Sequence, residues 1–482
     1  MSSGLFSIAR SALLTHQTAL QTVSQNIANA ETPGYSRQEV VRVANTPVRM
    51  SYGSVGTGVS IATIIRKRDI LLDESFRSAS TLASGTEMRR DLLRQVEGIF
   101  GEPSDEGMSN ALDQFWGAWS DLSASPSSLA ARSVVQQRGR QVGQLFNEYD
   151  TQLSQQRTSH LERLNNTVSG INSLATQVAE LNNRIVTSES NGNTNNDLRD
   201  LRDLKLDQLS QVGGTRVINQ ANGSVSVLIG NSTLVEGSTA RPLSLRLELP
   251  NPLPTTPITD VNVRIQLGDS PDRLAPLAGE LRSLVTVINV DIPEARGRLD
   301  AMAAQLVTAV NDVHTTGYVF SGTTLPGTAA GNFFDAGSMA NPVRAANMQL
   351  DAAVVADPSR IAASNDLNGP TANGTAQAMA ALRIAEGAVS WTSPLGTTET
   401  GSFLGFFRGM VTRIGIETAS ATDESTAYRT LAEQAETRRQ SISGVSTDEE
   451  LISMMNIQKS YQAAAKLIQS ADEMLQTLLS II

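Results

Sequence analysis

The sequence predicts a mainly α fold with β insertions, divided among several domains. Two observations lead to this prediction: apolar stripes with near-heptad spacing at both ends of the 482-residue chain, and long helical patterns that give way to alternating strand patterns in the middle. We expect the terminal helices to form a coiled-coil layer. A long helical bundle shaft and a smaller β-containing middle or outer domain are expected between them.

The first stripe predicts a helix from about Ser3 to Asn29, which stops at Thr32-Pro33-Gly34 because proline excludes the α region for the residue before it. Arg10 is the only fully charged residue among residues 1–30. Neutral polar side chains tolerate partial burial better than charges do, so neighbours should cover this helix on several sides. The stripe residues, at alternating steps of three and four, are Phe6, Ala9, Leu13, His16, Leu20, Val23 and Ile27.

The last stripe is apolar at every position and runs to the end of the chain. A capping box at Thr447-x-x-Glu450, after a break at Gly444, is predicted to start its helix. Such a stripe needs a partner along its length, so we expect the two ends of the chain to pack against each other. The stripe residues are Ile457, Tyr461, Ala464, Ile468, Ala471, Leu475, Leu478 and Ile482.

Between the two ends, helical and extended patterns alternate. The hairpin within 215–230 is expected to turn through a type I′ turn at Asn222-Gly223. A loop is expected at Pro250–Pro257. Other extended segments are expected at Arg37–Val48, Tyr52–Ile65, Val261–Leu267 and near Val343–Val355. Helices are expected at about Leu71–Leu209, Glu294–His314, Ala376–Ala388 and Leu404–Ser441.

The domain layout predicted from these patterns is nested. Residues 1–40 and 446–482 should form a terminal coiled-coil polymerisation domain. Residues 41–320 and 400–445 should form a helical rod domain that carries β-hairpin segments at about 50–65 and 213–267. Residues 321–399 should form a variable β or irregular outer region.

Composition excludes several classes of protein. A net charge of −10 argues against nucleic-acid binding, which needs a basic face. The absence of cysteine excludes disulfides, thiolate nucleophiles and cysteine-ligated metals. The sequence contains no run of about 18 apolar residues, so no membrane span is predicted. The first 20 residues lack the apolar core and cleavage pattern of a secretory signal peptide.

Catalytic chemistry is not indicated, and we predict no enzyme activity, no catalytic residue, no cofactor and no metal site. The histidines are widely separated, at His16, His160 and His314, and a packing role is expected for each. The glycines at 53, 56 and 58 indicate a turn. The segment Asn191–Asp197 is interpreted as a loop that ends in a helix cap. The charged run 198–209 is interpreted as the solvated face of a helix, and Trp116 and Trp119 as core residues.

Two segments resemble a known family. Asn26–Val40, with the sequence NIANAETPGYSRQEV, resembles the signature of the bacterial flagellar axial proteins of rod, hook and hook-associated type. The Ser-Arg-Gln form after Tyr35 is similar to the members found at the hook–filament junction, and residues 444–479 resemble the closing helix of the family. Residues 317–420 match little. Alternatives are a hook or distal rod protein, or a junction protein with an added surface-adhesin role.

The resemblance implies a structural protein that connects hook to filament and lies outside the cell. Its implied partners are copies of itself in a ring, hook protein below, a second junction protein above, an export chaperone on the C-terminal helix and the type III export apparatus, which would export it without signal cleavage. We expect the terminal helices to be largely unformed in the free monomer and to order on assembly. The expected interface is the two stripes, without His16, together with Thr32, Pro33, Gly34 and Tyr35.

Overall fold

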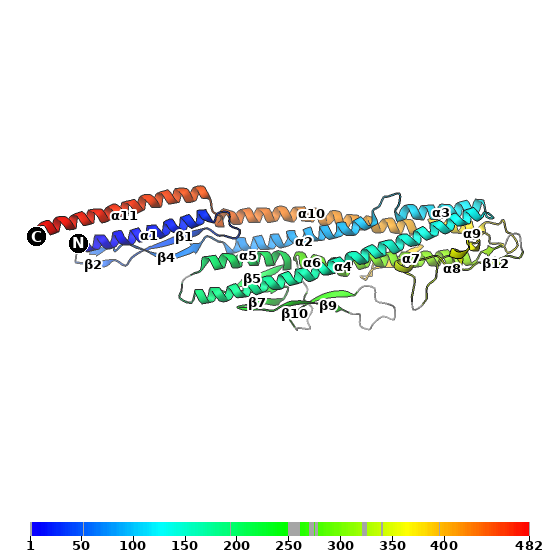
Figure 1. Cartoon of the computed structure of the whole chain (residues 1–482), viewed down its shortest axis with the longest axis horizontal. Coiled ribbons are helices and arrows are strands. Elements are labelled where there is room, and N and C mark those ends of the chain that lie inside the picture. The colour runs from blue at the N-terminus through cyan, green and yellow to red at the C-terminus, as the bar shows by residue number, and fades with distance from the viewer. Residues whose placement is uncertain are drawn as a thin grey trace.

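The chain forms a long rod with both ends of the chain at the same end of the molecule (Figure 1). The computed structural model describes residues 2–51, 53–192, 194–248, 261–268, 274, 278–320, 325–338, 341–394 and 396–481. The loop expected at Pro250–Pro257 and the stripe residue Ile482 lie outside the described residues. The predicted fold class, mainly α with β insertions, is confirmed.

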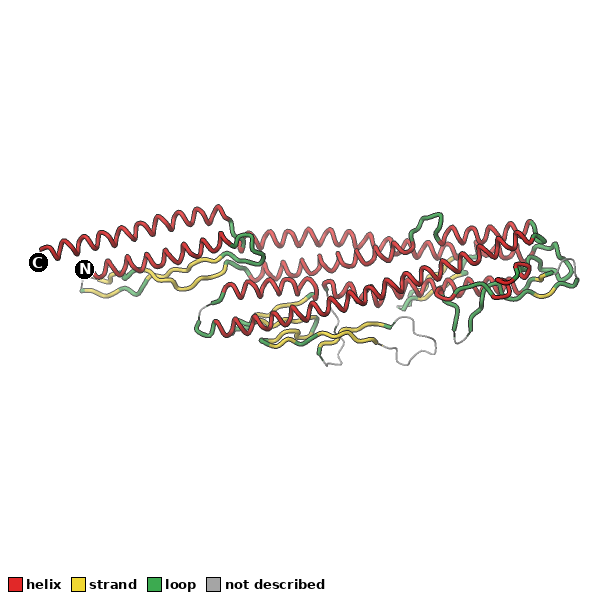
Figure 2. The backbone as a smooth tube through the Cα atoms, in the orientation of Figure 1, coloured by secondary structure: helices red, strands yellow, loops and turns green. Residues whose placement is uncertain are grey.

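The terminal part of the rod is a helix pair with a β ribbon along one side (Figure 2). Helix α1 (Ser2–Ala28) lies beside α11 (Thr447–Ile481). Strands β1 (Gln38–Ala44) and β4 (Val59–Arg66) pair antiparallel and contact α1. Strands β2 (Val48–Met50) and β3 (Gly53–Val55) pair beyond them. The extended segments predicted at 37–48 and 52–65 are therefore confirmed.

The shaft is a bundle of long helices. Helix α4 has 60 residues, which at 1.5 Å per residue corresponds to about 90 Å. Helices α2 and α10 lie side by side and continue the rod beyond the terminal pair. The helices of the shaft and of its far end are α2 (Ile70–Phe100), α3 (Met108–Ala124), α4 (Leu129–Ser188), α5 (Asn196–Gly213), α6 (Gly279–Thr286), a π-helical turn (Val287–Asp291), α7 (Ile292–Thr315), α8 (Ala352–Ala356), α9 (Gly374–Ala381) and α10 (Phe403–Ser443).

Small antiparallel sheets lie along the shaft. The largest has the order β5-β6-β7-β8, and β9 pairs with β10 beside it. The strands are β5 (Thr215–Asn219), β6 (Val225–Ile229), β7 (Ser232–Glu236), β8 (Thr239–Ala240), β9 (Leu243–Glu248), β10 (Asn262–Leu267), β11 (Tyr318–Val319), β12 (Thr328–Ala329), β13 (Val389–Thr392) and β14 (Thr398–Gly401).

The shaft has one large apolar core, whose far end is aromatic. Trp116 and Trp119 are buried there with Phe115 and Phe333, which confirms their predicted core role. His314 is fully buried in the same region: its Nδ1 lies 2.7 Å from the Gly331 carbonyl oxygen, and its Nε2 accepts a hydrogen bond from the Ala362 backbone N–H at 3.0 Å. Burial lowers the pKa of His314 to about 4, so the imidazole is neutral near pH 7.

Three local predictions are wrong. Only Gly223 of the Asn222-Gly223 pair has positive φ, whereas a type I′ turn needs it at both residues; the loop closes instead between Gln220 and Ser224. Near 343–355 the chain forms a 3₁₀ turn and α8, because the Asp351 carboxylate accepts from the Ala353 N–H and caps a helix. Helix α9 ends at Ala381, and strands β13 and β14 follow unpredicted.

Candidate assembly site

The two predicted stripes meet in the terminal pair. Ala19, Val23 and Ile457 form a buried cluster that is separate from the core of the shaft, and Leu20, Ile27, Val40 and Met454 pack against it. Further along the pair, the small side chains of Ala9, Ala464 and Ala471 are buried. Small residues at these positions let the two helix backbones approach closely. The other stripe residues with described side chains, which are Phe6, Leu13, His16, Leu20, Ile27, Tyr461, Ile468 and Leu475, are half-buried.

Asn26 is the hydrogen-bonding centre of the inner end of this pair. Its amide is 1% exposed, and Nδ2 donates to the Gln38 carbonyl and to Glu450 Oε2, both at 2.9 Å. Its Oδ1 accepts from the Tyr35 hydroxyl at 2.8 Å and from the Gln38 N–H at 3.0 Å. One side chain therefore links α1, the turn that follows it, β1 and α11.

The Thr-Pro-Gly-Tyr turn brings the chain from α1 back towards the shaft. Thr32, Pro33 and Gly34 are exposed, whereas Tyr35 is half-buried. Gly34 has φ of +81°, and a Cβ there would lie 3.0 Å from the Leu204 side chain, so a larger residue does not fit. Ser36 then donates to Asp200 twice, from its N–H at 3.0 Å and from its hydroxyl at 2.7 Å.

Glu450 corrects the predicted capping box. Its carboxylate does not return to the helix start but is 2% exposed and paired with Arg37 Nε at 2.8 Å. The residue at the N-cap position of α11 is Ser446, whose carbonyl accepts from the Glu450 N–H. Arg37 also pairs with Glu449, and its N–H donates to the Ser443 carbonyl. These contacts hold the connection between α10 and α11 against β1.

The charged run 198–209 is not a solvated face, and that interpretation is wrong. Asp200, Asp203 and Asp207 recur at steps of three and four on α5 and are all buried. Arg66 Nη1 lies 2.8 Å from both Asp200 and Asp203. Arg439 of α10 pairs with Asp207 at 2.6 Å. This ionic cluster, together with Arg68 and Arg77, joins the β ribbon to α2, α5 and α10.

The protonation states in this region follow from burial and the arginines. Burial opposes ionisation of Asp203, but Arg68, Arg66 and Arg77 outweigh it and lower its pKa. At Asp200 burial prevails and raises the pKa. Burial, followed by the nearby carboxylates of Asp197, Asp200 and Glu450, raises the pKa of Tyr35, so its hydroxyl keeps its proton and donates to Asn26.

Apolar side chains also lie on the outside of the terminal pair. On α11 they are Leu451, Ile452, Met455, Leu467 and Met474, all between 47% and 56% exposed, and on α1 they are Leu5 and Leu14. We call Ile452, Leu467 and Met474 the outer face of α11, because their spacing puts them on one flank of the helix, outside its seam with α1. Several large exposed apolar residues on neighbouring helices are typical of a surface that another chain covers.

The sequence predicted the stripes correctly but missed the polar residues that join them to the shaft. Leu478 lies in α11, but its side chain is outside the described residues, as is Ile482. The missed residues are Asn26, Ser36, Arg37, Gln38, Asp200 and Glu450. The Ser-Arg-Gln segment was a signal for some of them, whereas burial of Asp200 and Glu450 depends on tertiary contacts.

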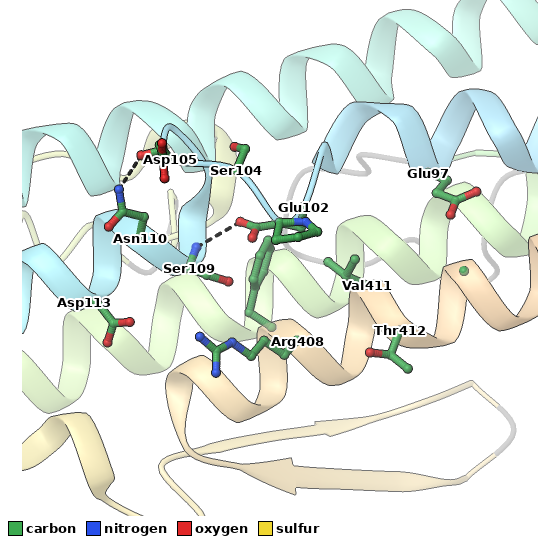
Figure 3. Close-up of a pocket in the computed structure, with 13 residues that line it drawn as sticks. Glu97, Glu102, Ser104, Asp105, Ser109, Asn110, Asp113, Arg408, Val411 and Thr412 are labelled. Atoms are coloured by element: carbon green, nitrogen blue, oxygen red, sulfur yellow. Dashed lines mark hydrogen bonds between the residues drawn. The ribbon is translucent and has the colours of Figure 1, made fainter.

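A separate cavity of about 630 Å³ lies where α2 passes into α3 beside α10 (Figure 3). Two of its carboxylates have structural roles: Glu102 accepts from the Ser109 N–H at 3.0 Å, in place of a capping side chain at Gly107, and Asp113 pairs with Arg383 at 3.0 Å. Within the described residues, no group of three or more His, Asp or Glu side chains is arranged to hold a metal. None of the helices in the described part is both long enough and apolar enough to cross a membrane.

Three known protein-family models match this chain. The model described as "Flagella basal body rod protein" matches residues 6–35, and "Flagellar basal body rod FlgEFG protein C-terminal" matches residues 438–481. The model described as "Flagellar hook-associated protein FlgK helical domain" matches residues 93–334. The terminal pair and the helical shaft therefore define a structural protein of the bacterial flagellum.

Comparison with individual proteins identifies the family within this class. Flagellar hook-associated protein 1 of Bacillus subtilis (strain 168) is 30% identical over 503 residues, covering 98% of this chain and 97% of that protein. The same protein of Escherichia coli (strain K12) is 25% identical over 557 residues, covering 99% and 100%. The chain belongs to the flagellar hook-associated protein 1 family, as the residues at 26–40 and 444–479 indicated.

A solved structure agrees at the level of the fold. The flagellar hook junction protein FlgK from Burkholderia pseudomallei matches with a TM-score of 0.62 at 17% identity, covering 76% of this chain and 100% of that chain. At this identity the match supports the arrangement of helices and small sheets and carries no information about individual interface residues.

Proposed function

We propose that this chain is a structural subunit that assembles with copies of itself and connects the flagellar hook to the filament. The observation that carries the proposal is the terminal pair: α1 and α11 project from the shaft, pack on each other along one side, and expose apolar side chains on the other. Copies packed side by side would bury those side chains. Hook protein on one side and a second junction protein on the other are the further partners that this role requires.

The proposed interface consists of the stripe and turn residues together with the outer face of α11. The stripe residues act within one subunit and hold α1 on α11, whereas the outer face contacts a neighbouring subunit. The division into a terminal part (1–40 and 446–482), a rod part (41–320 and 400–445) and an outer part (321–399) is proposed with it. The contacts of β1 and β4 with α1 favour extending the terminal part to about residue 66.

Export follows from the same proposal. The chain is proposed to leave the cell through the flagellar type III apparatus without loss of its first residues, and to act outside the cell. A chaperone that covers the outer face of α11 before export would keep those apolar side chains from associating too early. The large exposed fractions of Leu467 and Met474 support this part of the proposal.

Deletion of residues 447–482 tests the proposal in cells that lack the native protein. We expect the shaft to fold, hooks to form and filaments to be absent by electron microscopy. Leu475→Asp should have the same effect, as should Leu467→Glu on the outer face. Gln458→Glu adds the same charge on the opposite side of α11 from Leu467 and should still support filaments. Normal filaments with the deletion, or loss of hooks, would exclude a junction role through α11.

A further inference from the structure

A cleft of about 370 Å³ lies between the start of α2, the middle of α5 and the β5–β6 hairpin. These three elements lie next to one another in the shaft, close to the terminal pair (Figure 1). Five arginines line the cleft against three carboxylates. No sequence pattern indicated this cleft, because its lining comes from three separate segments, residues 66–77, 199–203 and 217–224.

The deepest cation in the cleft is Arg202, which is 4% exposed. Its Nη1 donates to the Gly223 carbonyl at 2.7 Å and to Asn182 Oδ1 at 3.2 Å, both neutral groups. Among the described residues, no carboxylate lies in ion-pair contact with Arg202, and its Nε has no hydrogen-bond partner. Burial lowers the pKa of Arg202 to about 10; the charge of Asp203, and to a smaller extent that of Glu189, opposes this shift, whereas Arg199 and Arg66 add to it. A buried guanidinium with no carboxylate in direct contact is costly.

Two other arginines face the same space with donors to spare. Arg66 uses Nη1 for both of its carboxylate contacts. Arg77 uses Nε for its hydrogen bond to Asp207, and its Nη2 lies 3.9 Å from Asp203, beyond hydrogen-bond distance. The carboxylates of the lining do not fill the gap: Asp73 is held by Arg68 through two hydrogen bonds, Asp203 by Arg66 and Arg68, and Glu74 is exposed. The unused N–H groups of Arg66, Arg77 and Arg202 are therefore matched to the oxygens of an additional anion.

We propose that this cleft binds an oxyanion, which supplies the direct ionic contact that Arg202 lacks. The oxygens come either from a free ion of the phosphate or sulfate type, or from a carboxylate of a neighbouring copy of this chain. Binding of a free ion by the monomer does not depend on the proposed assembly, whereas the second source does. The chain has a net charge of −10, so a neighbouring copy has many carboxylates to offer.

The test is thermal unfolding of the full chain in sodium sulfate and in sodium chloride at equal ionic strength. We expect sulfate to raise the Tm saturably, by about 1–2 °C at tenfold excess over its Kd. Gln220→Glu places a carboxylate in the lining without a change of shape. It should leave the Tm in chloride at or above that of the unmodified chain and weaken the sulfate response at least tenfold.

The matched control is Gln208→Glu, which makes the same change on the exposed side of α5 and should respond to sulfate as the unmodified chain does. An equal effect of sulfate and chloride on the unmodified chain would overturn the proposal. So would an unchanged sulfate response, or a clear loss of Tm in chloride, in Gln220→Glu relative to Gln208→Glu. Adding sulfate to assembled chains distinguishes the two sources of the oxyanion. If sulfate releases subunits, it competes with a carboxylate of a neighbouring copy. If the subunits stay assembled, the natural ligand is a free ion.

Discussion

Asn26 shows how much of the terminal part depends on one side chain. Its amide satisfies Tyr35, Gln38 and Glu450 at once, and only an amide offers both the donors and the acceptor that these partners need. Leu or Ala at this position would leave the Glu450 carboxylate buried beside Arg37 with one hydrogen bond fewer. The polar residues of the turn are thus as important to the terminal pair as its apolar stripes.

Asn26→Asp tests this assignment without a change of shape. The new carboxylate would face Glu450 and lose both donated hydrogen bonds, so we expect local opening of the terminal pair to become easier by about 2–4 kcal/mol. Hydrogen exchange of α1 and α11 amides measures this change. Asn29→Asp, in the turn directly after α1, is the control, with an expected effect under about 1 kcal/mol. Equal protection in both variants would contradict the central role of Asn26.

His314 predicts a pH dependence of the shaft. Its folded pKa of about 4 lies below the ordinary value, so the folded chain binds its proton less readily than the unfolded chain. The contribution of His314 to the free energy of unfolding is fully present above about pH 6.5. It is lost as the pH falls towards about 4, and the loss is roughly 3 kcal/mol at most. The slope of Tm between pH 7 and 5 should decrease in His314→Gln. An unchanged slope would assign the pH dependence to other groups, such as the buried His160.

At the level of elements, the α1–α11 contact is tight because alanines line it. Ala464 is 4% exposed and its neighbour Ala465 is exposed. Ala464→Asp would bury an unpaired charge, whereas Ala465→Asp would put it in water. We expect exchange of α1 amides to accelerate roughly 100-fold or more in the first variant and little in the second. The packed pair of the single chain differs from the sequence-based expectation that these helices order only on assembly. Equal, fast exchange in all three chains would favour that expectation, an unformed pair in the free monomer.

The elements also show what the sequence could and could not predict. Long periodic segments were predicted well, because the stripe of α11 and the pattern of α7 each bury one face. The Asn195 cap of α5 was also predicted, as the end of the loop at 191–197. The charged face of α5 was misread because its partners Arg66, Arg77 and Arg439 come from three distant segments. No local pattern distinguishes a carboxylate that meets water from one that meets a guanidinium.

The short elements failed for a related reason. Strands β13 and β14 have four residues each and rely on contacts of α7 and α10 rather than on their own pattern. Arg298 of α7 pairs with Glu399 of β14 and lies 4.0 Å from the ring of Trp391 in β13. These contacts hold a hairpin that propensity alone does not predict.

At the level of the whole molecule, the terminal pair and the shaft have separate apolar cores. The shaft buries a large continuous core, whereas the terminal pair buries a few side chains and exposes many. We therefore expect two thermal transitions in the monomer, with the terminal helices melting first, as followed by circular dichroism. Deletion of residues 447–482 should remove the first transition and leave the second in place. A single transition that the deletion shifts to lower temperature would show that the two parts unfold together.

Asn26 and Glu450 are 424 residues apart in the chain, and this separation determines when their contact can form during protein synthesis. During synthesis the first helix emerges from the ribosome long before Glu450 has been added to the chain. The ring of contacts around Asn26 can therefore close only after the chain has been made at least as far as residue 450. A chain that stops short of residue 450 lacks the residue that locks its own beginning in place.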